Sequence, residues 1–121
     1  MNKLVTVLLV FVFTLIGSFS YAHSPSEIKL NFDYEAKILK AIILHSVADS
    51  DKHYIKEIKI KKNNKEILVH KLSRQDNNTE QEVSYLIPDI NDSDTLTIIA
   101  YCSKIGQIKK DIKITFNKES K

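Results

Sequence analysis

Between residues 28 and 116 the chain alternates apolar and polar side chains over short runs, which is the period of strands with one buried face. Ile28, Leu30 and Phe32 show this alternation first. Comparable apolar-rich runs follow at residues 36–45, 54–62, 67–72, 83–87, 96–102 and 112–116. Most are separated by turns rich in Asn, Asp, Ser or Gly, and seven short strands at this spacing are typical of a two-sheet sandwich. We therefore expect an all-β fold, an immunoglobulin-like β-sandwich of about seven strands.

Three local features of that sandwich follow from one or two residues each. Ile55 is out of phase with Ile58 and Ile60, which predicts a β-bulge near the start of its strand. Asn63-Asn64 predicts a tight hairpin, because Asn tolerates the left-handed turn conformation. His70 is in phase with apolar neighbours and is predicted to be a half-buried strand histidine.

The first 22 residues have the pattern of a cleaved signal peptide. Lys3 precedes an apolar segment from Leu4 to Ile16, and Ser20-Tyr21-Ala22 ends the leader with small residues at the third and first positions before the cut. The apolar segment is shorter than the roughly 20 residues of a membrane anchor. We expect a periplasmic or secreted protein with one domain, residues 23–121, and no membrane attachment after cleavage.

The charge pattern excludes some functions. The formal net charge of +3 falls by one when the leader with Lys3 is removed, and acidic and basic residues are interspersed. No basic stripe with interleaved aromatic residues is present, so we expect no nucleic-acid partner. No hydrolase arrangement, phosphate loop or paired-carboxylate site is recognisable in the sequence.

The side chains with metal-binding or nucleophilic chemistry are few. They are His23, His45, His53, His70 and Cys102. His45 and His53 flank one loop, and Cys102 ends a strand, so the three can meet at one end of a sandwich. Two imidazoles and a thiolate suit iron, copper or zinc. By spacing alone, solvated histidines and a buried structural thiol fit as well.

One ordered set of residues carries a family resemblance. It consists of His45, a short loop, the run His53-Tyr54-Ile55, alternating isoleucines, and Ala100-x-Cys102 followed four residues later by Gly106. This order resembles the iron-binding domain of desulfoferrodoxin and neelaredoxin, the superoxide reductases. The resemblance extends over nearly all of residues 23–116.

The resemblance implies an oxidoreductase with one mononuclear non-haem iron and a redox partner protein. It implies His45 and His53 as equatorial ligands and Cys102 as the axial thiolate. His23, in His23-Ser24-Pro25, is similar in position to the family's N-terminal histidine, so the expected metal ligands are His23, His45, His53 and Cys102. Ile105 occupies the place of a further family histidine. We therefore expect metal binding with weak or absent superoxide reduction.

Two other interpretations are open at this point. The same sandwich is similar to the sulfur-carrier subunits of a periplasmic thiosulfate-oxidising system, which implies a metal-free interaction or carrier module. Alternatively, cleavage after Ala22 makes His23 the first residue, and its amine and imidazole then form a copper-binding pair. The metal, the redox partner and the oligomeric state do not follow from the sequence.

Overall fold

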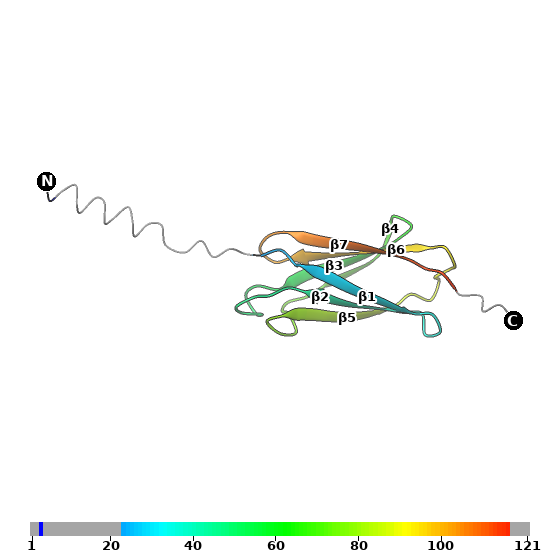
Figure 1. The fold of residues 1–121 in the computed structure, drawn as a ribbon, viewed down its shortest axis with the longest axis horizontal. Coiled ribbons are helices and arrows are strands. Elements are labelled where there is room, and N and C mark those ends of the chain that lie inside the picture. The colour runs from blue at the N-terminus through cyan, green and yellow to red at the C-terminus, as the bar shows by residue number, and fades with distance from the viewer. Residues whose placement is uncertain (1–2, 4–22, 117–121) are drawn as a thin grey trace.

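The computed structural model describes residue 3 and residues 23–116 (Figure 1). The expected signal peptide, residues 1–22, lies outside the described residues apart from Lys3, and so do residues 117–121. Among the described residues no helix is both long and apolar enough to cross a membrane.

Seven strands form the described domain: β1 (Glu27–Asp33), β2 (Ile38–Leu44), β3 (Ile55–Lys62), β4 (Lys65–Lys71), β5 (Glu80–Leu86), β6 (Thr95–Cys102) and β7 (Gln107–Lys113). They pair antiparallel in two sheets, with strand orders β1-β2-β5 and β4-β3-β6-β7. In the constant-type immunoglobulin arrangement the fourth strand joins the first, second and fifth. Here β4 stays in the second sheet, because a tight hairpin pairs it with β3. The expected all-β, immunoglobulin-like sandwich is confirmed.

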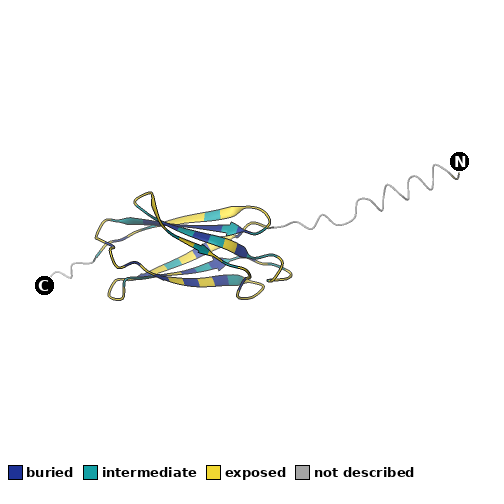
Figure 2. Ribbon diagram, turned by 180° about the vertical axis from the view of Figure 1, so that it is seen from behind, coloured by how far each residue is buried: buried dark blue, intermediate teal, exposed yellow. Residues whose placement is uncertain are grey.

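The core lies between the two sheets and is built mainly from alternate side chains (Figure 2). In β2, for example, Leu39, Ala41 and Ile43 are buried while the residues between them are more exposed. The central strand β6 is buried along nearly its whole length. Full burial of one isoleucine side chain stabilises the fold by about 1.5–3 kcal/mol. If a strand shifted by one residue against its neighbour, its buried side chains would face solvent. The alternation therefore fixes the strand register.

The predicted hairpin and the predicted β-bulge are both confirmed. Asn63 and Asn64 have φ angles of 50° and 67° and connect β3 to β4. The pairing of β3 with β6 shifts register between Ile55 and Glu57, which is the predicted bulge.

The prediction for the last strand is wrong in its extent. The apolar alternation of residues 112–116 predicts that Ile114 and Phe116 complete the sheet, but β7 ends at Lys113. The Ile114 and Phe116 backbone N–H groups donate instead to Asp94 and Asp92 in the preceding loop. Both side chains still contact the core, so the apolar pattern continues past the end of strand pairing.

The sandwich has two poles formed by different loops (Figure 1). We call one end the histidine pole: there residues 23–26, 45–54, 72–79 and 103–106 meet, where β2 and β6 end and β3 and β5 begin. We call the other end the turn pole, which contains residues 34–37, 63–64, 87–94 and 114–116.

Candidate metal centre

Three of the predicted site residues lie next to central strands at the histidine pole. His45 comes directly after β2, and Cys102 is the last residue of β6. His53 lies two residues before Ile55, the first residue of β3, which pairs with Cys102. Since β2 is central in one sheet and β3 and β6 are central in the other, the three side chains meet between the sheets where the core ends.

The three side chains form a compact cluster. Nε2 of His53 lies 3.0 Å from Sγ of Cys102. The rings of His45 and His53 meet edge to face, with centroids 4.7 Å apart and planes at 87°. One ligand atom from each of the three residues lies within 4.8 Å of the others. His45 and Cys102 are 1% and 4% exposed, whereas His53 is half-buried and links the cluster to solvent.

The sulfur of Cys102 is held in place by backbone and loop contacts. The Lys104 N–H group donates to Sγ at 3.4 Å. Ser103 is bonded to Tyr54 twice: its N–H donates to the Tyr54 carbonyl at 2.8 Å, and its Oγ accepts from the Tyr54 N–H at 3.1 Å. The free thiol is thereby buried and fixed at the end of β6, which accounts for an unpaired cysteine without a disulfide.

Both ring nitrogens of His45 have polar neighbours. Nδ1 lies 2.8 Å from Oε1 of Gln75, and Nε2 lies 3.0 Å from the carbonyl oxygen of His23. Gln75 is fully buried and comes from the loop between β4 and β5. Sequence reasoning missed this residue, because it lies in a polar run with no periodicity and no motif that marks it.

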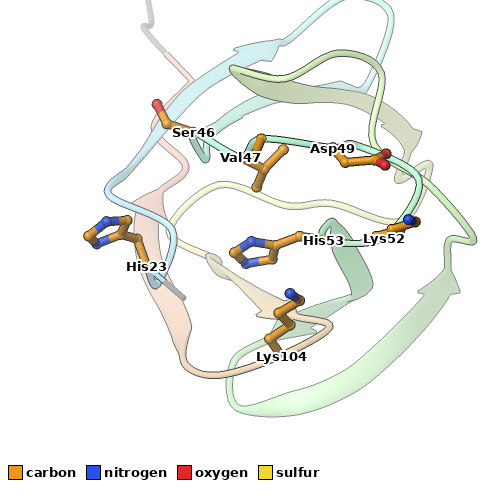
Figure 3. A pocket seen from close by; sticks show the side chains of 8 residues that line it. His23, Ser46, Val47, Asp49, Lys52, His53 and Lys104 are labelled. Carbon is orange, nitrogen blue, oxygen red and sulfur yellow. The ribbon is translucent and has the colours of Figure 1, made fainter. Parts of the chain in front are cut away.

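His23 approaches the cluster through its backbone. Its carbonyl contacts His45, while its ring is not part of the three-residue cluster and lies at the edge of the neighbouring pocket (Figure 3). The segment is anchored by the Ser26 N–H, which donates to the Leu44 carbonyl at 2.8 Å. The prediction that the His23 ring is a metal ligand stays a prediction.

A pocket of about 380 Å³ opens beside His53 and is lined in part by Lys52 and Lys104 (Figure 3). Burial lowers the pKa of His53 below its ordinary value, and the neighbouring positive charges, His45 first, lower it further. A lowered pKa favours the uncharged ring, which is the form that binds a metal. The pocket gives the cluster access to solvent and has room for a small exogenous ligand.

The donor set and its spacing fit one transition-metal ion. Bonds of roughly 2.0–2.1 Å to imidazole nitrogen and 2.3 Å to sulfur place these two atoms about 3.5 Å apart in a tetrahedral site. His53 Nε2 and Cys102 Sγ, now 3.0 Å apart, need to separate by only about half an ångström to reach that spacing. Three protein ligands leave at least one coordination position for a further ligand.

Two other predicted residues lie outside the cluster. Ile105 is 60% exposed in the loop after Cys102 and has no donor atom to offer. His70 is half-buried on β4, as predicted, and its Nδ1 lies 2.8 Å from the hydroxyl of Tyr85 on the other sheet.

Of the four predicted ligands, the structure brings together His45, His53 and Cys102. No protein-family model, curated protein or solved structure matches the chain. The described residues thus contain a candidate metal-binding site with two imidazoles and one thiol.

Proposed function

We propose that this protein binds one transition-metal ion through His45, His53 and Cys102, and that the ion is iron. The observation that carries the proposal is the convergence of three ligand atoms within 4.8 Å at the end of the core. Imidazole and thiolate are donors that iron, copper and zinc all accept. Iron is favoured among them by the resemblance of this ordered residue set to the superoxide reductases.

The proposal includes a cellular compartment and a redox role. The leader pattern supports a periplasmic or secreted protein, and an iron centre there would exchange electrons with a partner protein. The Cys102 thiolate would tune the potential of such an iron, as would its hydrogen bond from Lys104. Since Ile105 supplies no imidazole, the iron would have fewer nitrogen ligands than in the family, and superoxide reduction is expected to be slow or absent.

Metal content tests the proposal directly. Protein purified from its own compartment, and protein equilibrated anaerobically with Fe²⁺, should each contain one ion per chain. His45→Ala and His53→Ala should lose it, whereas His70→Ala, which changes a histidine outside the cluster, should retain it. Wild-type protein that takes up neither Fe²⁺, Zn²⁺ nor Cu⁺ would disprove the proposal.

A gain-of-ligand variant tests the link to superoxide chemistry. Ile105→His should tighten Fe²⁺ binding and raise the rate of superoxide reduction, because it restores an imidazole at the family position. Fast superoxide reduction by the wild-type protein would show that Ile105 is not what limits the reaction.

A metal-free interaction module is the second candidate function. It is favoured by exposed apolar side chains on β4 and β5, the strands at one edge of each sheet: Leu86 is 64% exposed, Val69 43% and Ile67 39%. If metal analysis finds no ion, the histidine cluster is structural and this surface becomes the functional part of the molecule.

A further inference from the structure

Gln75 is a fully buried glutamine whose amide orientation is fixed by its own contacts. Its Nε2 group donates to the carbonyl oxygens of His45 at 2.8 Å and Asn77 at 2.9 Å. A carbonyl oxygen can only accept, so the amide nitrogen must lie on that side. The atom facing Nδ1 of His45 at 2.8 Å is therefore Oε1, and Nδ1 must be the donor in that bond.

This contact decides which nitrogen of His45 can bind an ion. Because Gln75 Oε1 holds the hydrogen on Nδ1, only Nε2 can become free to bind an ion. In this structure Nε2 donates to the His23 carbonyl at 3.0 Å, and a bound ion would replace that hydrogen and that contact. We propose that Gln75 is a positioning residue of the metal centre, which selects Nε2 of His45 as the metal-binding atom and holds the ring toward His53 and Cys102.

The inference rests on the proposed metal-binding function and adds a residue outside the ligand set. A metal-binding histidine usually donates its other ring N–H to a carboxylate, carbonyl or water, and loss of that partner lowers metal affinity about 10–100-fold. Gln75 fills this role with a side-chain amide. Among the described residues of the 72–79 loop, Gln75 is the only one with a hydrogen bond to the His45 ring.

Gln75 also has a purely structural role that a test must separate. Its backbone N–H donates to the Ser50 carbonyl at 3.0 Å, and its side chain ties the loop to His45 and Asn77. Any substitution of Gln75 can therefore loosen the 72–79 loop and the 45–54 loop. Lower affinity in one variant would not distinguish loss of ring positioning from loss of loop structure.

Three variants separate the two roles. Gln75→Met removes both the acceptor for Nδ1 and the two donated bonds. Gln75→Glu keeps an oxygen acceptor for Nδ1 but also loses the donated bonds. Gln81→Met is the matched control, because Gln81 is a buried glutamine that bonds Asp76 and Glu82 and does not contact His45.

We would measure Zn²⁺ affinity, urea unfolding and the ¹⁵N–¹H spectra of the histidine rings in Zn²⁺-loaded, full-length protein. In the wild type, His45 should bind zinc through Nε2 and show a protected Nδ1–H signal. Gln75→Met should bind zinc about 10–100-fold more weakly and lose that protection. Gln75→Glu should lose stability as Gln75→Met does but retain zinc affinity and the Nδ1–H signal, and Gln81→Met should retain both.

The outcomes distinguish this inference from the proposed function. Zinc bound through Nδ1 of His45 would overturn the role of Gln75 while leaving the metal site intact. The same conclusion would follow if Gln75→Met and Gln75→Glu lowered affinity equally, or if Gln81→Met lowered it as much. Wild-type protein that binds no metal would instead overturn the proposed function.

Discussion

Both poles of the sandwich close loops with Asp and Asn side chains, and the histidine pole adds a buried set of other polar groups. At the turn pole the partners are exposed or half-buried carboxylates and amides. Asp94 accepts from Asn63 Nδ2 and from the Asn91 N–H, both at 2.8 Å. Lys62 pairs with Asp89 at 2.7 Å. These short polar side chains are sufficient to hold tight turns, and such residues are the usual ones in turns.

At the histidine pole Asn77 and Asn78 make similar loop bonds, and buried imidazole, amide and thiol groups are present in addition. His45, Gln75 and Cys102 are at most 4% exposed, and all are close to the end of the core. A buried polar group is costly unless its partners are well placed. The turn pole shows that this protein can close loops without such groups, so the histidine pole holds more than loop closure requires. This difference is the reason for assigning function there.

The largest expected effect is at the histidine pole and removes the sulfur ligand. Cys102→Ser should abolish the thiolate-to-metal absorption band and lower Fe²⁺ or Co²⁺ affinity by more than about 100-fold, because loss of an outer partner alone costs about 10–100-fold. Anaerobic titration followed by absorption measures both. An unchanged band would mean that the sulfur is not a ligand and that the cluster is structural.

The next effect tests how the segment at residues 23–26 is held against the site. Gly106 has φ +86°, and a Cβ there would overlap Oγ of Ser24 and lie 2.7 Å from its Cβ. Gly106→Ala should therefore lower the free energy of unfolding by about 1–3 kcal/mol, from left-handed strain and steric overlap.

The overlap can be separated from the backbone strain. In a Ser24→Gly background, Gly106→Ala should cost less than in the wild type, with a coupling on the order of 1 kcal/mol measured by a double-mutant cycle in urea. Equal costs in both backgrounds would show that Ser24 does not pack on the 103–106 loop in solution.

Most of the fold could be predicted from the sequence, because strand alternation is a local pattern. Every strand was expected, and even the bulge followed from the phase of Ile55. The end of β7 was mispredicted, since Ile114 and Phe116 keep the apolar phase while their backbone bonds switch to the turn pole. The hydrophobic pattern predicts which side chains are buried. It does not predict whether their backbone groups bond a neighbouring strand or a loop.

The site was predictable only in part for a related reason. His45, His53 and Cys102 lie at strand ends, and strand order brings strand ends together. Gln75 and the His23 carbonyl reach the site from irregular segments. Their positions depend on loop conformation, which no periodicity encodes.

A change at the turn pole should affect stability without affecting metal binding. Asn63→Ala places Ala at φ 50° and removes bonds to Asp94 and to the Thr95 N–H, the latter at 2.9 Å. The free energy of unfolding should fall by about 1–2 kcal/mol. Asn64→Gly is the matched control, because glycine suits the φ of 67° there, and it should cause little loss. Lower metal affinity in Asn63→Ala would contradict the independence of the two poles.

The smallest effect is the pH dependence of the turn pole. The hydrogen bond from Asn63, followed by that from the Asn91 backbone, lowers the pKa of Asp94 below its ordinary value. The hydrogen bond from Lys62 likewise lowers the pKa of Asp89. In the unfolded chain Asp has a pKa of about 3.9. At pH values near and below this, the unfolded chain therefore binds more protons than the folded chain. The contribution to stability is therefore complete above that value and is lost as the pH falls through the folded pKa.

This loss should be modest, because Asp89 is exposed, Asp94 is only half-buried, and solvent screens their interactions. Urea midpoints of the metal-free protein, measured in chelator from pH 5.5 down to pH 3, should fall in the wild type. They should fall less in Asp94→Asn and Asp89→Asn, since those variants have no carboxylate to protonate at these positions. The same slope in all three proteins would place the acid sensitivity outside the turn pole and would weaken the contrast between its carboxylate contacts and the buried cluster of the histidine pole.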